Sequence, residues 1–287
     1  MAESLRDHSR QECVGAPGRG RSELKGAEFH KQYSEDVDLE FEKASALYEL
    51  SGREGFSAPR PLRVDQETNT IVYAALTDLQ SIRDVYLDYV CGAVDDQAAI
   101  NTFFESGRVL AAIHRELQLS NARRWESPER FSSSGETGDR FEMLPMAFLH
   151  GDYGFANVFV GESDTDLIVL DASPNYFVTF STNCYGPVYL DIGNMLSCMD
   201  GLVPWAKHLK MQLARVRTLE SAFVSGYESD NELLLDKSLL TQFTEATSLT
   251  YLEYRLRSKI LGRIGYSILY NPVRRSLIRP ISQSSIS

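Results

Sequence analysis

The sequence lacks any long apolar run, since none approaches the roughly 20 residues that a membrane-spanning helix needs. Its N-terminus is polar from the start and has no apolar stretch of the kind found in secretory signals. The chain has only four cysteines, which are scattered without the spacing of a metal site. We therefore expect a cytoplasmic protein with reduced thiols and no membrane partner.

Basic residues are too few for a general nucleic-acid binder. The chain has 29 Lys and Arg against 40 Asp and Glu, so its formal net charge is −11. Because a nucleic-acid-binding protein needs a basic face, we expect no nucleic-acid partner. A cationic substrate is compatible with this charge, although acidic solubility explains it more simply.

The apolar pattern divides the chain into two lobes with irregular ends. A strand-like alternation at 27–33, a helix pattern from Asp38 and a β-rich run at 70–76 predict a small α+β lobe. The rest is mostly helical. The four parts are an irregular N-terminus, a small α+β lobe, a larger helical lobe and an exposed tail: residues 1–24, 25–78, 79–272 and 273–287.

One polar loop lies between apolar flanks, in "FLHGDYGFANVFV" at residues 148–160. The flanks anchor a turn that carries Asp152 and Asn157. Two short apolar runs follow, separated by the turn-prone "ESDT", and predict a hairpin that ends at Asp171. A carboxylate held in such a turn can accept a proton from an incoming hydroxyl. An amide oxygen and a second carboxylate are hard ligands suited to Mg²⁺ bound jointly with phosphate, so the set favours phosphoryl transfer.

The motif "HGDYGFAN" resembles the H-G-D-x-x-x-x-N catalytic loop of the aminoglycoside phosphotransferase-like (APH/choline kinase-type) kinase family. "LIVLDASP" resembles the family's metal-binding Asp after a short strand, and "GPVYLDIGNML" resembles its G-D-P-x-x-D-L-A helix start. "LAAIH" and "FEKASALYEL" are similar to two further helices. The resemblance implies an α+β, protein-kinase-like two-lobed fold, with a small N-terminal lobe that is reduced here and a larger, mainly helical C-terminal lobe. It also implies that the small lobe (25–78) binds the nucleotide and that the helical lobe (79–272) is catalytic and binds the acceptor.

The resemblance also implies a role for each matching residue of the large lobe. Asp152 would be the catalytic base, or the acid that orients the nucleophile. Asn157 and Asp171 would hold Mg²⁺. Asp191 would accept backbone hydrogen bonds from the catalytic loop, and His150 would help to pack that loop.

In the small lobe, the resemblance implies that a helix glutamate pairs with a lysine that contacts the nucleotide phosphates. Glu42 matches the glutamate. Lys31, on the strand before that helix, is our choice for the lysine, and Lys25 is the rival. The hinge that meets the adenine should follow the 70–76 strand, near residues 75–77.

This chain departs from the family pattern at two places. The family has two strands and a phosphate-covering turn before the lysine strand. Here "VGAPGRGRSE" (14–23) could bring backbone N–H groups to a phosphate, but without flanking apolar strands it fits a flexible tail better. The long segment between Asp171 and Gly186 either shapes a substrate pocket or packs as an extended loop.

These features predict a kinase that uses ATP, or another NTP, and Mg²⁺ to phosphorylate a hydroxyl of an aminoglycoside, sugar or amino-alcohol acceptor. The alternative is a catalytically inactive kinase-like binding protein with a degenerate nucleotide lobe. A protein kinase is a weaker third hypothesis, because the loop has His-Gly-Asp in place of His-Arg-Asp. His114, at a helix end, is expected to be packed and hydrogen-bonded and not a metal ligand or base.

Overall fold

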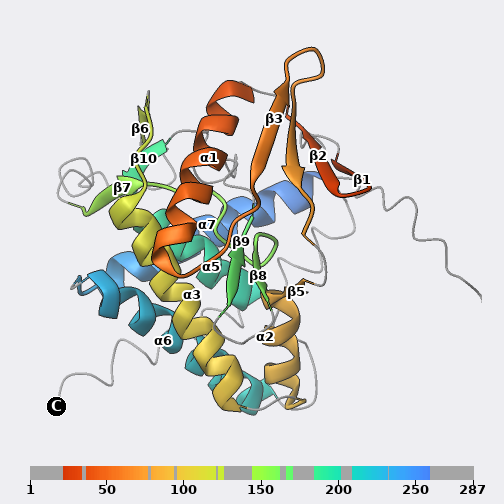
Figure 1. Cartoon of the computed structure of the whole chain (residues 1–287). Helices are drawn as coiled ribbons and strands as arrows, with labels where there is room; N and C mark the ends of the chain where they lie inside the picture. Colours follow the sequence, from red (N-terminus) through yellow and green to blue (C-terminus); the bar gives the residue numbers. More distant parts are fainter. Residues whose placement is uncertain are drawn as a thin grey trace, which may run out of the picture.

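The computed structural model begins with an antiparallel four-stranded sheet, in the order β1-β2-β4-β3, with one helix against it (Figure 1). We call this part the small lobe. The structure describes residues 22–33, 37–76, 79–93, 96–120, 122–125, 144–161, 166–170, 184–201, 209–231 and 233–258. The elements of the small lobe are β1 (Ser22–Lys25), β2 (Glu28–Gln32), α1 (Val37–Glu54), β3 (Pro61–Asp65) and β4 (Thr70–Ala74).

An apolar cluster holds α1 against the sheet. Phe29 and Tyr33 alternate along β2 and its end, so their side chains lie on one face. There they pack with Phe41 and Ala44 of α1. Because Lys31 lies between them in the strand, the alternation predicts that its side chain is on the face of the sheet that α1 covers.

The observed small-lobe boundaries differ slightly from those expected. β1 includes Ser22–Leu24, which the sequence pattern assigned to the irregular N-terminus. The helix α1 continues through Gly52 and ends before Gly55, whose φ of +75° suits glycine. Residues 1–21 and the tail 273–287 lie outside the described residues.

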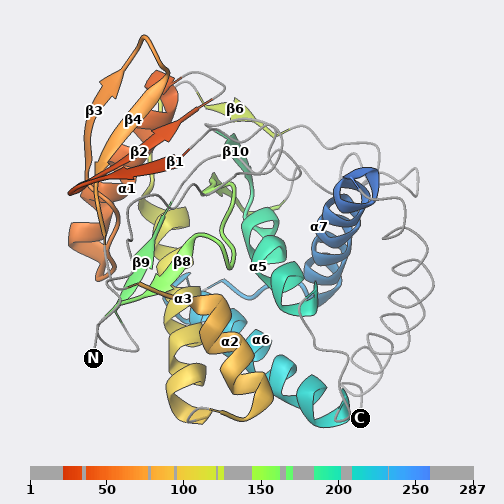
Figure 2. The same cartoon turned by 90° about the vertical axis from the view of Figure 1, so that its right-hand side faces the viewer.

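The large lobe is mainly helical, and its helices α2, α3, α5 and α6 lie below the four-stranded sheet in Figure 2. It also holds two three-stranded sheets, β5-β8-β9 and β6-β10-β7. Its elements are β5 (Gln80–Ser81), α2 (Ile82–Cys91), α3 (Asp96–Glu116), β6 (Arg123–Arg124), β7 (Met146–Phe148), β8 (Val158–Val160), β9 (Leu167–Val169), β10 (Cys184–Pro187), α5 (Tyr189–Gly201), α6 (Leu209–Asn231) and α7 (Lys237–Ser258).

Strands β8 and β9 form the hairpin that the sequence predicted. The segment after α1 joins this hairpin through Ser57, which bridges to Ile168. The Ser57 N–H donates to Leu167 O, and the Val169 N–H donates to Ser57 O, both at 2.8 Å. The small lobe is therefore attached by main-chain hydrogen bonds next to the end of β9.

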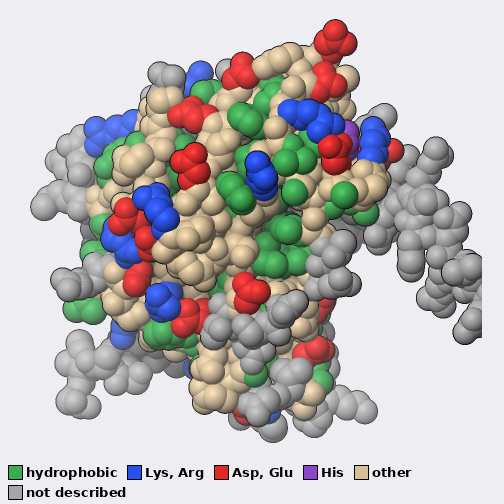
Figure 3. All heavy atoms as spheres, in the orientation of Figure 1, with side chains coloured by type: hydrophobic (Ala, Val, Ile, Leu, Met, Phe, Trp, Pro, Cys, Tyr) green, Lys and Arg blue, Asp and Glu red, His purple; other side chains and the backbone are tan. Residues whose placement is uncertain are grey.

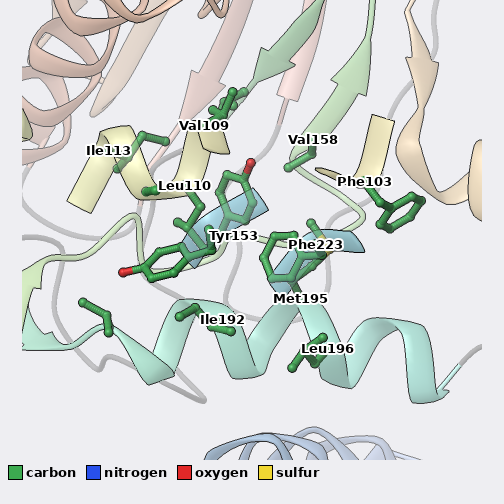
Figure 4. Close-up of a cluster of buried hydrophobic side chains, with 14 of the residues drawn as sticks. Phe103, Val109, Leu110, Ile113, Tyr153, Val158, Ile192, Met195, Leu196 and Phe223 are labelled. Carbon is green, nitrogen blue, oxygen red and sulfur yellow. The ribbon is translucent and has the colours of Figure 1, made fainter. Parts of the chain in front are cut away.

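The core of the large lobe is formed where three helices meet the loop between β7 and β8. Figure 4 shows Tyr153 of this loop among side chains from α3, α5 and α6. Tyr153 is fully buried and donates a hydrogen bond to Ser106 O at 2.8 Å. Burial raises the pKa of its phenol, despite the opposing effect of the hydrogen bond with Ser106. The loop is thus part of the core and not a surface turn.

Helices α3 and α6 cross at two glycines. A Cβ added to Gly107 would overlap the carbonyl oxygen of Phe223, and one added to Gly226 would overlap that of Phe104. Each obstacle is backbone, so no side-chain rotation relieves the overlap. The two glycines therefore allow a close crossing that brings Tyr227 beside His114, with ring centroids 5.6 Å apart.

The surface carries charges of both signs. On the face shown in Figure 3, acidic and basic side chains are interspersed. In the part of the chain that the structure describes, no helix is both long and apolar enough to cross a membrane.

We expect Gly107→Ala to lower the free energy of unfolding by about 2–3 kcal/mol or more, because the added methyl forces α3 and α6 apart. Gly52→Ala in α1 is the matched control, since a Cβ there meets nothing within 4 Å. The control should stabilise the chain by about 0.5–1 kcal/mol, because alanine favours the helix. Urea unfolding measures both changes. Equal effects of the two variants would contradict the role assigned to the crossing.

Candidate active site

The candidate site lies on the loop from Leu149 to Asn157, between β7 and β8. Gly151 has a φ of +90°, a region that favours glycine. A turn follows, in which the Asn157 N–H donates to Gly154 O at 2.9 Å. The loop therefore turns back at once, and the side chains of Asp152 and Asn157 lie close together.

Asp191 holds the backbone of this loop. It lies in the first turn of α5 and is fully buried. Its Oδ2 accepts the His150 N–H at 2.7 Å, and its Oδ1 accepts the Gly151 N–H at 2.9 Å. One carboxylate thus fixes two consecutive peptide groups, and hydrogen bonds to a charged acceptor are the stronger kind.

Behind Asp191 lies a buried histidine. His114 Nε2 is 3.1 Å from Asp191 Oδ2, and His114 Nδ1 is 2.9 Å from the Tyr227 hydroxyl. The prediction that His114 is packed and hydrogen-bonded is confirmed. A chain of contacts therefore leads from α6 through α3 to α5 and the loop.

The environment of Asp191 favours its charged form. Burial on its own raises the pKa of this carboxyl, but the hydrogen bond from His114 and several smaller effects together outweigh burial, and the pKa lies below its ordinary value. The N–H of Gly151 acts in the same direction. Asp191 is therefore an anionic acceptor at neutral pH.

Two amides hold the carboxylate of Asp152, which is 8% exposed. Asn157 Nδ2 donates to Asp152 Oδ2 at 3.0 Å and to Asp152 O at 2.9 Å. From the other side, Asn194 Nδ2 lies 3.4 Å from Asp152 Oδ1 and donates to Tyr153 O at 3.1 Å. The orientation of the carboxylate is thus fixed by side-chain amides on two sides.

The contacts of Asn157 also set which way its amide points. Its nitrogen lies within hydrogen-bonding distance of two oxygens, so this atom must be the donor. The side-chain oxygen makes neither of these contacts and is of the type that Mg²⁺ binds. The expected second ligand, Asp171, lies outside the described residues. Within the ranges that are described, no three His, Cys, Asp or Glu side chains gather as a metal site.

His150 connects the loop to the end of β9. Its Nδ1 is 3.3 Å from the Asp152 N–H, so Nδ1 is an acceptor, and its Nε2 is 3.1 Å from Leu170 O, so Nε2 carries the proton. This tautomer ties the loop to the residue that precedes Asp171. Of the predicted large-lobe residues, the structure therefore brings together His150, Asp152, Asn157 and Asp191.

The predicted lysines lie on the β1–β2 hairpin. Lys31 of β2 has its Nζ 4.8 Å from the centroid of the Tyr33 ring. Lys25 pairs with Glu23 at 3.1 Å, and both side chains are about half exposed, with 55% of each accessible. Of the two, Lys31 is the one on the face of the sheet that α1 covers.

The predicted glutamate, Glu42, binds the segment after α3. Its Oε1 accepts from the Ser120 N–H at 2.8 Å and from the Ser120 hydroxyl at 2.6 Å. Glu40, two residues earlier, lies about 200° away around the helix and is only 5% exposed. Sequence reasoning missed this second acid. The signal was its place on the stripe that continues through Leu47 and Leu50.

Structural comparison finds that the fold of this chain is similar to those of several solved small-molecule phosphotransferases. A glucosamine kinase superposes with a TM-score of 0.55 at 17% identity, covering 78% of this chain and 68% of that one. The macrolide 2'-phosphotransferase MphH from Brachybacterium faecium gives 0.52 at 15%, covering 92% of each chain. The aminoglycoside phosphotransferase APH(3'')-Id from Streptomyces rimosus, in complex with ADP and streptomycin, gives 0.51 at 12%, covering 80% and 89%.

These similarities are to the fold. The expected protein-kinase-like fold, with an N-terminal antiparallel sheet and a mainly helical C-terminal part, is confirmed. No protein-family model matches the sequence, and no curated protein sequence matches it either.

We expect Asp191→Asn to lower the free energy of unfolding by about 3–5 kcal/mol at neutral pH, because it removes the charge from a buried hydrogen-bonded centre. The folded pKa of Asp191 is depressed, so this contribution is present above the unfolded value of about 3.9 and is lost as pH falls through the folded value. The gap between the native chain and the variant should therefore shrink below about pH 4.

Urea unfolding at a series of pH values tests this. Asp84→Asn, at the exposed start of α2, makes the same chemical change away from the loop and is the control. A gap that stays constant down to about pH 3 would contradict a depressed pKa at Asp191.

Proposed function

We propose that this chain is a small-molecule kinase that moves the γ-phosphoryl group of ATP, or of another NTP, to a hydroxyl group in the presence of Mg²⁺. The observation that carries the proposal is the almost buried carboxylate of Asp152, which two amides orient on a loop pinned by Asp191. Phosphoryl transfer depends mainly on positioning and on charge stabilisation, and this site supports the first directly.

In this proposal, Asp152 accepts the hydrogen of the acceptor hydroxyl and aims its oxygen at the phosphorus. The donors from Asn157 and Asn194 leave the carboxylate little freedom to rotate. Its burial excludes most water, which would otherwise compete for the phosphoryl group.

The side-chain oxygen of Asn157, beside Asp152, is of the kind that Mg²⁺ binds. Asn157 would bind it through the side-chain oxygen, and Asp171 would supply the carboxylate. When bound, Mg²⁺ neutralises the phosphate oxygens and so stabilises the charge of the transition state. His150 supports this arrangement, because it hydrogen-bonds the residue that precedes Asp171.

The small lobe would hold the nucleotide through Lys31 and an acid of α1. The sequence favours Glu42 for that acid. The structure adds Glu40 as a competitor, since Glu40 lies on the buried side of α1 whereas Glu42 is engaged by Ser120. An acid that orients a phosphate-binding lysine has to face the sheet, which favours Glu40.

The names of the similar structures support a hydroxylated small molecule as acceptor. They are a glucosamine kinase, a macrolide phosphotransferase and an aminoglycoside phosphotransferase. We therefore propose an acceptor of the aminoglycoside, sugar or amino-alcohol type. A net charge of −11 is compatible with a cationic acceptor of this kind.

We expect Asp152→Asn to lower the rate of phosphoryl transfer by about 10²–10⁴-fold while Mg·ATP binding is kept, because the amide cannot accept the hydroxyl proton. Transfer is measured as ATP consumption across a panel of aminoglycosides, sugars and amino alcohols. Binding is measured as thermal stabilisation, which reaches about 2.7 kcal/mol at 100 times Kd. Asp84→Asn is the control and should leave both the transfer rate and Mg·ATP binding unchanged.

Two outcomes would contradict this proposal. Activity that survives Asp152→Asn would refute the assigned mechanism. If Mg·ATP neither stabilises the native chain nor is consumed with any acceptor, the alternative of an inactive kinase-like binding protein is favoured.

Glu40→Gln and Glu42→Gln form a matched pair that decides which acid supports Lys31. If Glu40 does, Glu40→Gln should weaken Mg·ATP binding by about tenfold, because one charge-assisted contact is lost. Glu42→Gln should then leave binding unchanged. Isothermal titration with Mg·ATP measures both. The reverse order of effects would restore Glu42 to the role that the sequence suggests.

A further inference from the structure

Lys43 of α1 is a fully buried lysine, with a relative exposure of 0%. Its ammonium Nζ donates to the backbone oxygen of His150 at 2.7 Å. It lies on the side of α1 that carries Leu47 and Leu50, which belong to the core of the large lobe. The small lobe therefore places a positive charge directly on the catalytic loop.

The peptide group between His150 and Gly151 has a charged partner at each end. Its carbonyl oxygen accepts from Lys43, and its N–H donates to Asp191 Oδ1 at 2.9 Å. A peptide group carries a dipole with the oxygen end negative and the hydrogen end positive. The cation and the anion therefore match the two ends of this dipole, and both contacts favour the same orientation of the peptide plane.

This peptide plane needs an external restraint. Rotating it changes ψ of His150 and φ of Gly151, and Gly151 tolerates a wide range of φ because it has no Cβ. Gly151 is also the residue that precedes Asp152. A rotated plane would thus redirect the carboxylate that the proposed reaction depends on.

A buried ammonium is costly, which argues against a mere packing role for Lys43. Removing such a charge from water has a large desolvation cost, and methionine has a similar length without that cost. The neighbouring Cys184 does not supply a counter-charge. Burial raises the pKa of the Cys184 thiol to about 12 despite the opposing effect of the Lys43 charge, so the thiol stays neutral.

We propose that Lys43 is a positioning residue that acts with Asp191 as an electrostatic clamp on the peptide between His150 and Gly151, and so sets the direction of Asp152. Its effect on catalysis rests on the proposed kinase function, whereas the clamp itself does not. Because Lys43 belongs to α1, the geometry of the catalytic loop depends on the position of the small lobe.

The clamp can be observed without any assay of activity. The pairs Leu-His and His-Gly each occur once in the sequence, at 149–150 and 150–151. Selective ¹³C/¹⁵N labelling of these residue types therefore isolates the His150 and Gly151 amides in NMR spectra. In the native chain, we expect a single His–Gly signal with a downfield His150 carbonyl shift and a Gly151 amide protected from exchange.

In Lys43→Met, the carbonyl signal should move upfield, and the Gly151 amide should exchange on the order of tenfold faster, since the freed peptide spends time turned away from Asp191. The His150 amide, bound to the other oxygen of Asp191, should keep its protection. Lys237→Met makes the same change on an exposed lysine of α7 and should leave both amides unchanged.

Kinetics supply the second readout. Lys43→Met should lower kcat for the proposed transfer by about 10- to 100-fold with little change in the KM for ATP, because Asp152 is misdirected while the nucleotide site is kept. Lys237→Met should keep both constants.

An unchanged Gly151 exchange rate in Lys43→Met would overturn the clamp, whatever happens to activity. If Lys43→Met does not fold, the NMR measurements on the native chain still test the clamp. A rapidly exchanging Gly151 amide, or a His150 carbonyl shift typical of a free peptide, would overturn the proposal there. A native chain that shows the clamp but transfers no phosphate would count against the kinase function alone.

Discussion

The carboxylate of Asp191 is the constraint on which the candidate site depends. It is buried and anionic, and it accepts hydrogen bonds from two successive N–H groups of the loop and from His114. A buried carboxylate needs hydrogen-bond partners in place of water. His114 is one of these partners, and the Tyr227 hydroxyl lies at hydrogen-bonding distance from its other ring nitrogen. The conformation of the loop therefore depends on buried residues behind it. The close crossing of α3 and α6 contributes, because it brings Tyr227 beside His114.

Two kinds of contact fix the conformation of the loop. Charged groups, Asp191 and Lys43, hold its backbone, whereas neutral amides, Asn157 and Asn194, hold the side chain of Asp152. This division has a physical reason. Charged partners give the backbone strong, fixed bonds, while neutral amides orient a carboxylate without adding a charge beside it.

The sequence pattern is enough to group the polar residues of this loop, because its signals are local. His150, Asp152 and Asn157 lie within eight positions, and Asp191 opens the next helix after a recognisable Gly-Pro start. Asn194 was missed because one polar residue in "DIGNML" resembles an ordinary interruption of an apolar helix.

The charged residues of α1 were harder to predict. This helix is buried on two sides, against the sheet and against the large lobe, so its buried stripe is wider than the apolar pattern. Glu40 and Lys43 lie in the part of the stripe that is not apolar, and charged residues are almost never fully buried unless paired. Only the placement of both lobes around α1 identifies them as interior residues.

The crossing of α3 and α6 has a consequence for the evolution of this chain. At Gly107 and Gly226 the opposing atoms are main chain, so a larger residue at one position has no compensating replacement at the other. We therefore expect a homologue that retains this helix contact to have glycine at both positions. Glycines at the positions of Gly107 and Gly226 could therefore help to identify homologues of low sequence identity.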